Sequence, residues 1–216
     1  MPERTSSSSR HVRAGSGNAT GERARVRIIG GNWRGRWIHF FAAQGLRPTG
    51  DRMRETLFNW IQIPVRGARC LDLFAGTGVL GIEAISRGAA EAVLVERSPA
   101  VGRQLENEIA NLVAGESELE HRLSVQSMAA QEFIETVAQT HAPFDIVFVD
   151  PPFSQDVQID VLNGLLRSEL LAPQAMIYVE APADMTLKER IPLGLEIYRT
   201  STQGKVQCLL LERSGE

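Results

Sequence analysis

The tetrapeptide Asp150-Pro151-Pro152-Phe153 is the most specific chemical signal in the chain, and it follows an apolar run over residues 144–149. The two prolines remove backbone donors and hold the chain extended. The Asp150 carboxylate and the Pro151 carbonyl then offer two acceptors side by side, which suits an exocyclic NH₂ group. Phe153 offers a ring on which a flat base can stack. The alternative is an ordinary loop after a buried strand.

An exocyclic amine is a poor nucleophile because its lone pair is delocalised into the ring. Acceptors on its two hydrogens favour the pyramidal amine and localise that lone pair. A methyl group on a sulfonium then needs only in-line placement at near-attack distance. No strong general base is required, since the proton becomes acidic once the C–N bond forms. A base within a helix is out of reach, so the target must be unpaired or flipped out.

A glycine-rich segment over residues 70–81 precedes this tetrapeptide and predicts a strand, a tight loop and a helix. Such a junction brings backbone N–H groups and a helix N-terminus close to a ligand. Gly76-x-Gly78-x-x-Gly81 matches the dinucleotide fingerprint, which alone is weak and also occurs for packing reasons. Glu96 ends the next predicted strand, where a carboxylate can accept both hydroxyls of a ribose. We therefore expect a nucleotide-type cofactor.

NAD and S-adenosylmethionine can both use such a loop. Asp72 lies at the end of the strand, where it would favour a cationic ammonium and repel a pyrophosphate. Together with the tetrapeptide at a second strand end, this favours S-adenosylmethionine and methyl transfer to an amine. A nicotinamide oxidoreductase is the weakest interpretation, because no hydride-site residue is recognisable.

The rest of the chain alternates between strand and helix patterns. Alternation of this kind predicts an α/β fold with a parallel sheet covered on both faces and ligands at the carboxyl ends of the strands. A Ser201–Gly204 turn near the end predicts an antiparallel hairpin. The predicted strands cover residues 91–96, 122–126, 144–149, 175–180, 194–200 and 205–212. The predicted helices cover 99–113, 129–139 and 156–171, and a further helix lies within residues 47–62.

Charge is unevenly divided along the chain. The net charge is −3, but residues 1–54 hold eleven arginines against three acidic residues, a local charge of +8. The remainder holds 12 basic and 23 acidic residues, a charge of −11. This predicts a basic arm on an acidic body and a polyanion as partner. A solvated basic tail without a ligand is the alternative.

The basic region divides into three parts. Residues 1–24 are rich in Ser, Gly and Arg and are predicted to be disordered. Residues 25–46 contain two β-prone runs around Gly30-Gly31-Asn32, which predicts a hairpin or two short strands whose tryptophans both pack on the body and contact bases. The helix within residues 47–62 is expected to be capped by Thr49 or Asp51. The candidate nucleic-acid contacts are Arg25, Arg27, Arg34, Arg36, Trp33 and Trp37 in the hairpin region, Arg47 ahead of the helix, and Arg52 and Arg54 in the helix, both expected to be free to contact a ligand.

Cys70 and Cys208 both lie in apolar runs, so we expect core residues in a reducing compartment. No spacing typical of a metal site is present, and no metal is expected.

The N-terminus lacks the apolar segment of a secretory signal, and no run approaches the roughly 20 apolar residues of a membrane span. We expect a soluble cytoplasmic protein with no membrane partner.

The combined pattern resembles the RsmD family, the 16S ribosomal RNA guanine-N2 methyltransferases. Coverage runs from about residue 25 to 212. The matching stretches are Arg27 to Gly31 with Arg34 to Arg36, Arg47 to Thr49, Asp51 and Arg52, Arg54 to Asn59, Leu71 to Gly88, Glu96, and Phe148 to Phe153.

The resemblance implies a Rossmann-like, seven-stranded class I methyltransferase sheet with S-adenosylmethionine as donor. A basic tail (1–24), an RNA-binding hairpin (25–46) and a methyltransferase domain (47–216) would make up the chain. It also implies transfer to N2 of one guanine in 16S rRNA, within an assembled or assembling small ribosomal subunit. We expect the protein to be a monomer. The implied residues are Asp72, Phe74, Gly76, Gly78 and Glu96 for the cofactor, Ser127, Met128 and Ala129 beside its adenine, Arg47 and Thr49 at its amino-acid end, and Asp150 to Phe153 for the guanine.

Two other functions stay open at this point. A DNA adenine-N6 methyltransferase would use the same tetrapeptide, and the arginine-rich arm fits either polymer. A non-catalytic RNA-binding protein could keep the fold, although Asp72, Glu96 and the intact tetrapeptide argue against it.

Overall fold

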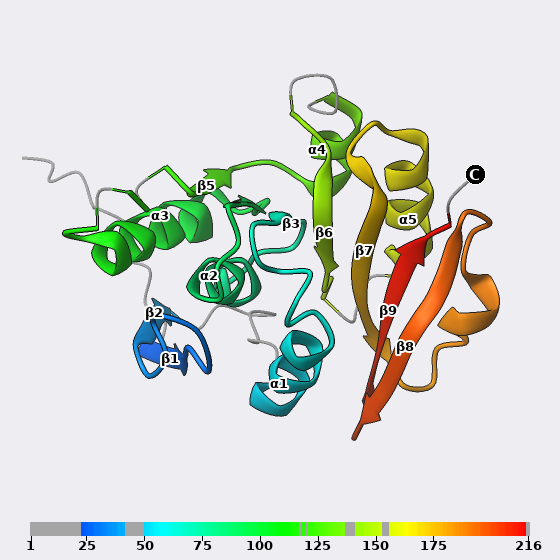
Figure 1. The fold of residues 1–216 in the computed structure, drawn as a ribbon, viewed down its shortest axis with the longest axis horizontal. Coiled ribbons are helices and arrows are strands. Elements are labelled where there is room, and N and C mark those ends of the chain that lie inside the picture. Colours follow the sequence, from blue (N-terminus) through cyan, green and yellow to red (C-terminus); the bar gives the residue numbers. More distant parts are fainter. Residues whose placement is uncertain are drawn as a thin grey trace, which may run out of the picture.

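The computed structural model describes residues 23–41, 50–116, 118–119, 121–136, 141–152 and 156–214. Within them the chain forms a two-stranded and a seven-stranded sheet with helices (Figure 1). The strands are β1 (Arg23–Arg27), β2 (Trp37–Phe41), β3 (Arg69–Asp72), β4 (Glu91–Val95), β5 (Leu123–Gln126), β6 (Phe144–Val149), β7 (Leu171–Pro182), β8 (Leu195–Gln203) and β9 (Val206–Arg213). The helices are α1 (Asp51–Trp60), α2 (Val79–Ser86), α3 (Pro99–Val113), α4 (Ala130–Thr136) and α5 (Gln158–Arg167), with a 3₁₀ turn η1 (Leu187–Arg190).

The large sheet has the strand order β5-β4-β3-β6-β7-β9-β8. Strands β3 to β7 pair in parallel, whereas β9 pairs antiparallel with both β7 and β8. The order reverses between β3 and β6, and ligands of open α/β sheets bind at the carboxyl ends beside such a point. The predicted parallel sheet with a C-terminal antiparallel hairpin is confirmed.

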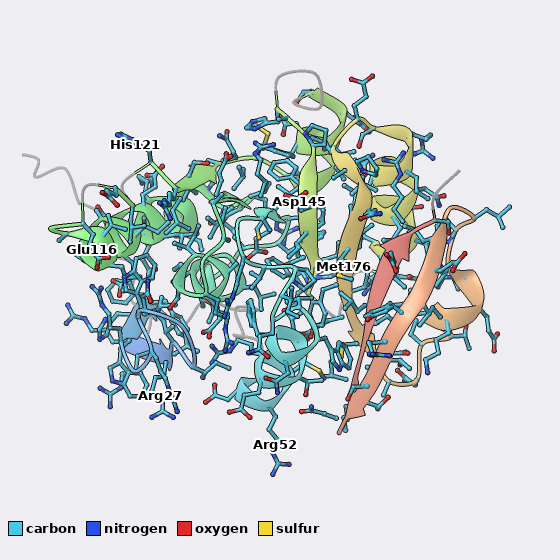
Figure 2. All side chains as sticks on the ribbon, in the orientation of Figure 1. Arg27, Arg52, Glu116, His121, Asp145 and Met176 are labelled. Atoms are coloured by element: carbon cyan, nitrogen blue, oxygen red, sulfur yellow. The ribbon has the colours of Figure 1, made fainter. Side chains whose placement is uncertain are left out.

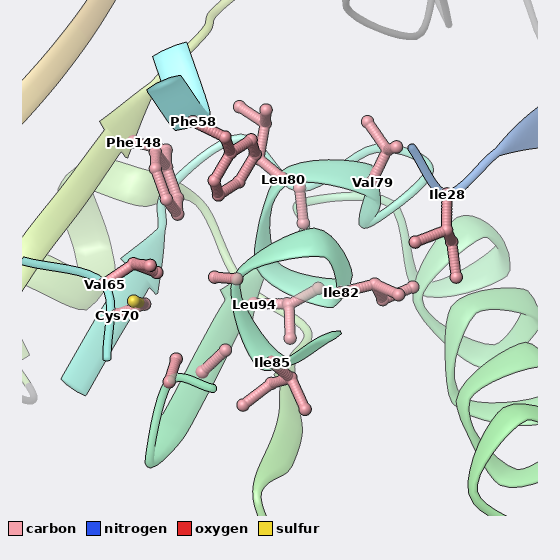
Figure 3. Close-up of a cluster of buried hydrophobic side chains, with 14 of the residues drawn as sticks. Ile28, Phe58, Val65, Cys70, Val79, Leu80, Ile82, Ile85, Leu94 and Phe148 are labelled. Carbon is pink, nitrogen blue, oxygen red and sulfur yellow. The ribbon is translucent and has the colours of Figure 1, made fainter. Parts of the chain in front are cut away.

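The side chains of the sheet alternate between two cores. One core joins the sheet to α1, α2, α3 and the β1–β2 hairpin, and Figure 3 shows part of it, with Ile28, Phe58, Cys70 and Phe148 among its members. The other core joins the sheet to α4, α5 and η1. Cys70 and Cys208 are buried and unbridged, so their prediction as core residues is confirmed.

The hairpin docks on the C-terminal end of α2. The Ser86 hydroxyl donates to the Gly30 carbonyl at 2.7 Å, and the Asn32 amide donates to the Ser86 carbonyl at 2.7 Å. Gly31 has φ +73°, and a Cβ there would lie 1.8 Å from that carbonyl oxygen. Only glycine permits this approach, because it has no Cβ and adopts positive φ.

Some predicted boundaries are wrong. The helix predicted over 156–171 ends at Arg167, because Leu171 already pairs with Phe144 as part of β7. The predicted Ser201–Gly204 turn is displaced, since β8 continues to Gln203 and the reversal occurs at Gly204 and Lys205.

The N-terminal boundaries also differ. Strand β1 begins at Arg23, inside the tail predicted over residues 1–24, while residues 1–22 lie outside the described part of the chain. Helix α1 starts at Asp51 with Gly50 as N-cap and no side-chain cap, so the capping prediction for Asp51 is wrong. In the described part of the chain, no helix is long and apolar enough to cross a membrane.

Candidate active site

Three carboxylates stand at the carboxyl edge of three neighbouring strands. Asp72 ends β3, Asp150 directly follows β6, and Glu180 lies near the end of β7. Residues two apart on a strand share a face. Each carboxylate is two positions beyond a side chain of the core under α1 to α3, so all three belong to that face; these core side chains are Cys70, Phe148 and Tyr178.

Asp72 is almost fully buried, with 2% of its surface exposed. Its Oδ2 accepts a hydrogen bond from the Gly81 amide at 3.3 Å, whereas Oδ1 is buried without a hydrogen-bond partner among the described residues. Burial, and secondarily the charge of Asp150, raise the pKa of Asp72 to about 7. A buried oxygen without a donor fits a ligand that brings a cationic N–H group.

The glycine loop between β3 and α2 is held by backbone geometry and by packing. Gly78, the N-cap of α2, has φ +73°, and a Cβ there would lie 2.4 Å from Leu105 Cδ1. A Cβ at Gly81 would lie 3.1 Å from the Leu94 side chain. A side chain at Gly78 would therefore require a left-handed backbone and a shift of Leu105, and one at Gly81 of α2 would press on Leu94. Without side chains, both positions present backbone instead.

Glu96 follows β4 directly and accepts a hydrogen bond from the glycine loop. Its Oε2 accepts from the Gly76 amide at 3.1 Å, and its Oε1 accepts from the Ser98 amide at 2.7 Å. Each carboxylate oxygen keeps a second lone-pair direction. Glu96 is half-buried, so these directions are available to the hydroxyls of a ribose.

The loop after β5 contributes the next group of predicted residues. Ser127, Met128 and Ala129 lie between β5 and α4, at the same edge as Glu96, because β5 pairs in parallel with β4. A Cβ at Gly102 of α3 would lie 2.7 Å from Ser127 Oγ, so α3 passes close to this loop. The structure thus brings the loops after β3, β4 and β5 to one edge.

The predicted substrate residues are described only in part. Asp150 is half-buried, Pro151 is buried and Pro152 is half-buried, at the edge that also carries Asp72. Phe74, in the loop after β3, is half-buried. The predictions for Arg47, Thr49 and Phe153 lie outside the described residues.

Glu180 is a residue of this site that sequence reasoning missed. It is 4% exposed, its Oε1 accepts from the Tyr178 hydroxyl at 2.6 Å, and its carboxyl shares a hydrogen bond with that of Asp150. Burial, followed by the charge of Asp150, raises the pKa of Glu180 to about 8. The available signal was an acidic residue at the end of an otherwise apolar strand.

A basic and aromatic surface covers the outer face of the β1–β2 hairpin. Val26, Ile38 and Phe40 are buried on its inner face. The outer face pairs Arg23 with Phe41, Arg25 with His39 and Arg27 with Trp37 across the two strands. The Arg25 guanidinium lies 4.2 Å from the Trp37 ring centroid. Figure 2 shows Arg27 on this hairpin and Arg52 on α1 projecting outward on the same side of the molecule.

The other predicted contacts have different environments. Trp33 is buried and donates to Glu116 from its indole nitrogen, so the prediction that a tryptophan packs on the body is confirmed. Trp37 is 39% exposed, and its contact with bases stays a prediction. Arg34 is exposed, and Arg36 lies 3.3 Å from Glu116. The prediction that Arg54 is free to meet a ligand is wrong, because its side chain is fully buried and paired with Asp51 and Glu83.

Comparison with known proteins gives consistent matches over this fold. The family model described as Conserved hypothetical protein 95 matches residues 26–212. The Ribosomal RNA small subunit methyltransferase D of Escherichia coli K12 is 42% identical over 191 residues, covering 88% of this chain and 91% of that protein. The protein of the same name from Haemophilus influenzae is 40% identical, covering 84% and 94%. The solved structure of Escherichia coli yhhF superposes with a TM-score of 0.75 at 40% identity, covering 89% of this chain and all of that one.

Proposed function

The chain belongs to the RsmD family, the family of the Conserved hypothetical protein 95 model, and from this we propose that it methylates the exocyclic N2 amine of one guanine in small-subunit (16S) rRNA. It is a methyltransferase that uses S-adenosylmethionine as donor. The observation that carries the proposal is the placement of Asp72 and Asp150 on one sheet face, at adjacent strand ends.

S-adenosylmethionine supplies an electrophilic methyl group on a sulfonium. We assign Asp72 to the cationic amino group of this donor, because its buried Oδ1 lacks a partner among the described residues. The backbone at Gly76 and Gly78 would line the donor, and Glu96 would accept its ribose hydroxyls. Phe74 and the segment Ser127 to Ala129 would border the remaining parts. Thr49 is proposed for the donor's amino-acid end on family resemblance alone.

The Asp150 carboxylate and the Pro151 carbonyl would accept the two hydrogens of the guanine amine. Both acceptors would favour the pyramidal amine and so localise its lone pair on nitrogen. With the donor bound, the nitrogen would take the methyl group as the S–C bond breaks, and Asp150 or water would accept the amine proton. Pro152 would contact the base, and the Phe153 ring would stack on its face.

Two features support RNA as the polymer. The relatives from Escherichia coli and Haemophilus influenzae are named as methyltransferases of small-subunit ribosomal RNA. The outer face of the hairpin presents arginines beside Trp37 and Phe41, which suits phosphates and unstacked bases. Arg25, Arg27, Arg34, Arg36, Arg47 and Arg52 are the proposed contacts.

We further propose that residues 25–46 act as the RNA-binding hairpin, residues 47–216 as the methyltransferase domain, and residues 1–24 as a basic tail. The substrate would be the assembled or assembling small subunit, and the protein would act as a monomer in the cytoplasm. Sedimentation of the purified protein tests the monomer, and transfer to subunits against naked 16S rRNA tests the form of the substrate.

The decisive experiment uses labelled donor with small ribosomal subunits from a strain lacking the gene, and maps the product by mass. One methylguanine should appear in the RNA. Duplex DNA is the competing substrate, and methyladenine formed there would instead support the DNA enzyme. Failure to bind the donor would support a non-catalytic RNA-binding protein.

Asp150→Ala should abolish transfer while donor binding survives. Asp156→Ala is the matched control, because Asp156 is an exposed aspartate of the same loop that pairs with Arg190. Undiminished turnover by Asp150→Ala would refute the role proposed for this carboxylate.

A further inference from the structure

Glu180 is not among the residues proposed to hold the donor or the guanine, although its carboxyl contacts that of Asp150. The carboxyl is buried between the Tyr178 hydroxyl and Asp150. Gln158 of α5 donates to the Glu180 backbone carbonyl at 3.1 Å, which fixes the strand at this position. A buried ionisable group in direct contact with a substrate residue requires an explanation.

The hydrogen bonds of Glu180 determine where its proton must be. The Tyr178 hydroxyl donates to Oε1, so Oε1 is an acceptor. The second bond joins two carboxyl groups, and two ionised carboxylates have no hydrogen to share. The Asp150–Glu180 pair therefore holds one proton. Glu180 is the more buried partner, and burial penalises its charged form.

We propose that Glu180 is a positioning residue that, as a neutral acid, donates its proton to the Asp150 carboxylate and fixes the Asp150 oxygen that receives the guanine amine. This inference rests on the proposed function. Asp150 stays ionised and keeps lone pairs for the amine, while Tyr178 holds the acid in one orientation. The site thus contains a relay of donors that runs from Tyr178 through Glu180 to Asp150.

The surroundings of Glu180 offer no compensating positive charge among the described groups that act on it. Asp150 is acidic, burial raises the pKa of Tyr178 well above its ordinary value, and the pKa of Cys208 on β9 rises to about 11. Loss of the Glu180 proton at alkaline pH would place two negative carboxylates in contact. Asp150 would then turn away, and kcat would fall.

The test compares three variants as donor-loaded full-length proteins acting on undermethylated small ribosomal subunits. Glu180→Gln keeps an acceptor for Tyr178 and a donor for Asp150, so it should retain most of the wild-type kcat. Glu180→Ala should lower kcat by about 100-fold, the cost of a misplaced group, with little change in either KM. The Tyr178 hydroxyl donates to Glu180 and thereby lowers the pKa of Glu180. Tyr178→Phe removes this hydrogen bond, so the alkaline fall in kcat should move to higher pH.

The pH profile separates this role from a merely structural one. Wild-type kcat should fall above about pH 8, and Glu180→Gln should lack that fall. A Glu180→Gln variant that is folded, binds donor and is as inactive as Glu180→Ala would overturn the proposal. An alkaline fall that is unchanged in Glu180→Gln would overturn it as well.

A readout without turnover distinguishes this inference from the proposed function. The infrared spectrum of the wild type at neutral pH should contain a protonated carboxylic acid band that Glu180→Gln removes. If the band is present and no guanine is methylated, the proposed function fails and the protonated Glu180 stands. If the band is absent while methylation proceeds, the inference fails alone.

Discussion

Nη1 of Arg54 lies 3.3 Å from Oε2 of Glu83, and both side chains are fully buried. The same guanidinium donates to the Arg27 carbonyl at 3.0 Å, and the Ile29 amide donates to Glu83 at 2.9 Å. One buried ion network therefore connects α1, α2 and the hairpin. The network thus connects the hairpin, which carries the proposed RNA-binding surface, to α2, the helix that begins at the glycine loop.

Arg54→Ala should lower the free energy of unfolding by about 3 kcal/mol, because it leaves the Glu83 carboxylate buried with less compensation. Arg87 still lies 3.0 Å from Glu83, which keeps the loss at the lower end of the range for buried pairs. Arg52→Ala is the control, since Arg52 is exposed on the same helix, and it should change stability by less than about 0.5 kcal/mol. Denaturation in urea measures both, and equal losses would contradict the structure.

Gly31→Ala should destabilise the protein far more than Gly35→Ala. Both glycines have positive φ, 73° and 90°, so both variants carry backbone strain of about 1–3 kcal/mol. Only at Gly31 would the new Cβ collide with backbone, 1.8 Å from the Ser86 carbonyl oxygen, whereas nothing lies within 4 Å at Gly35. Thermal unfolding of the two variants checks the difference, and similar melting temperatures would mean that the hairpin does not dock as described.

The glycine loop and the residues after β6 were predictable because their signals are local. An apolar run that ends in Asp72 or Asp150, followed by glycine or proline, specifies a strand end without knowledge of the fold. Parallel pairing then brings such ends to one edge. The alternation of patterns predicted the sheet for the same reason.

The environments of Arg54 and Glu180 were not predictable, because each depends on a partner far away in sequence. Helical spacing placed Arg54 away from the apolar face of α1, and it could not show that the side chain would be buried against Glu83 of α2. Glu180 contacts Asp150 only because β7 lies next to β6. The end of α5 was predicted too late in the chain, because an apolar residue such as Leu171 fits both a helix and a strand. Its pairing with Phe144 places it in β7.

The hairpin arginines should contribute to RNA affinity in a salt-dependent way. Arg25→Ala should weaken binding to 16S rRNA, and the slope of log K against log salt should fall by about 0.7–0.9 for each phosphate that the variant no longer neutralises. Arg199→Ala is the control, because Arg199 is an exposed arginine on the edge strand β8 that also stacks on an aromatic ring, Tyr198. Filter binding over a range of salt measures the slope. An equal effect of both variants would contradict a specific role for the hairpin.

Asp72 should make both stability and donor affinity depend on pH. Its folded pKa of about 7 lies above the ordinary aspartate value of 3.8, so between these values the folded state binds more protons than the unfolded state. The free energy of unfolding contributed by Asp72 should therefore fall as pH rises from about 4 through about 7. Asp72→Asn removes this dependence, so it should be more stable than wild type at pH 8 and similar at pH 4, as urea denaturation can show.

Donor affinity should change with pH in the opposite direction, because the ionised carboxylate is the form that attracts a cationic amino group. Affinity for S-adenosylmethionine should rise up to about tenfold per pH unit below pH 7 and level off above it, with proton release on binding near pH 6. Calorimetry in two buffers of different ionisation heat counts that proton. Asp72→Asn should bind weakly at every pH and release no proton, so a wild-type slope in this variant would assign the titration to another group.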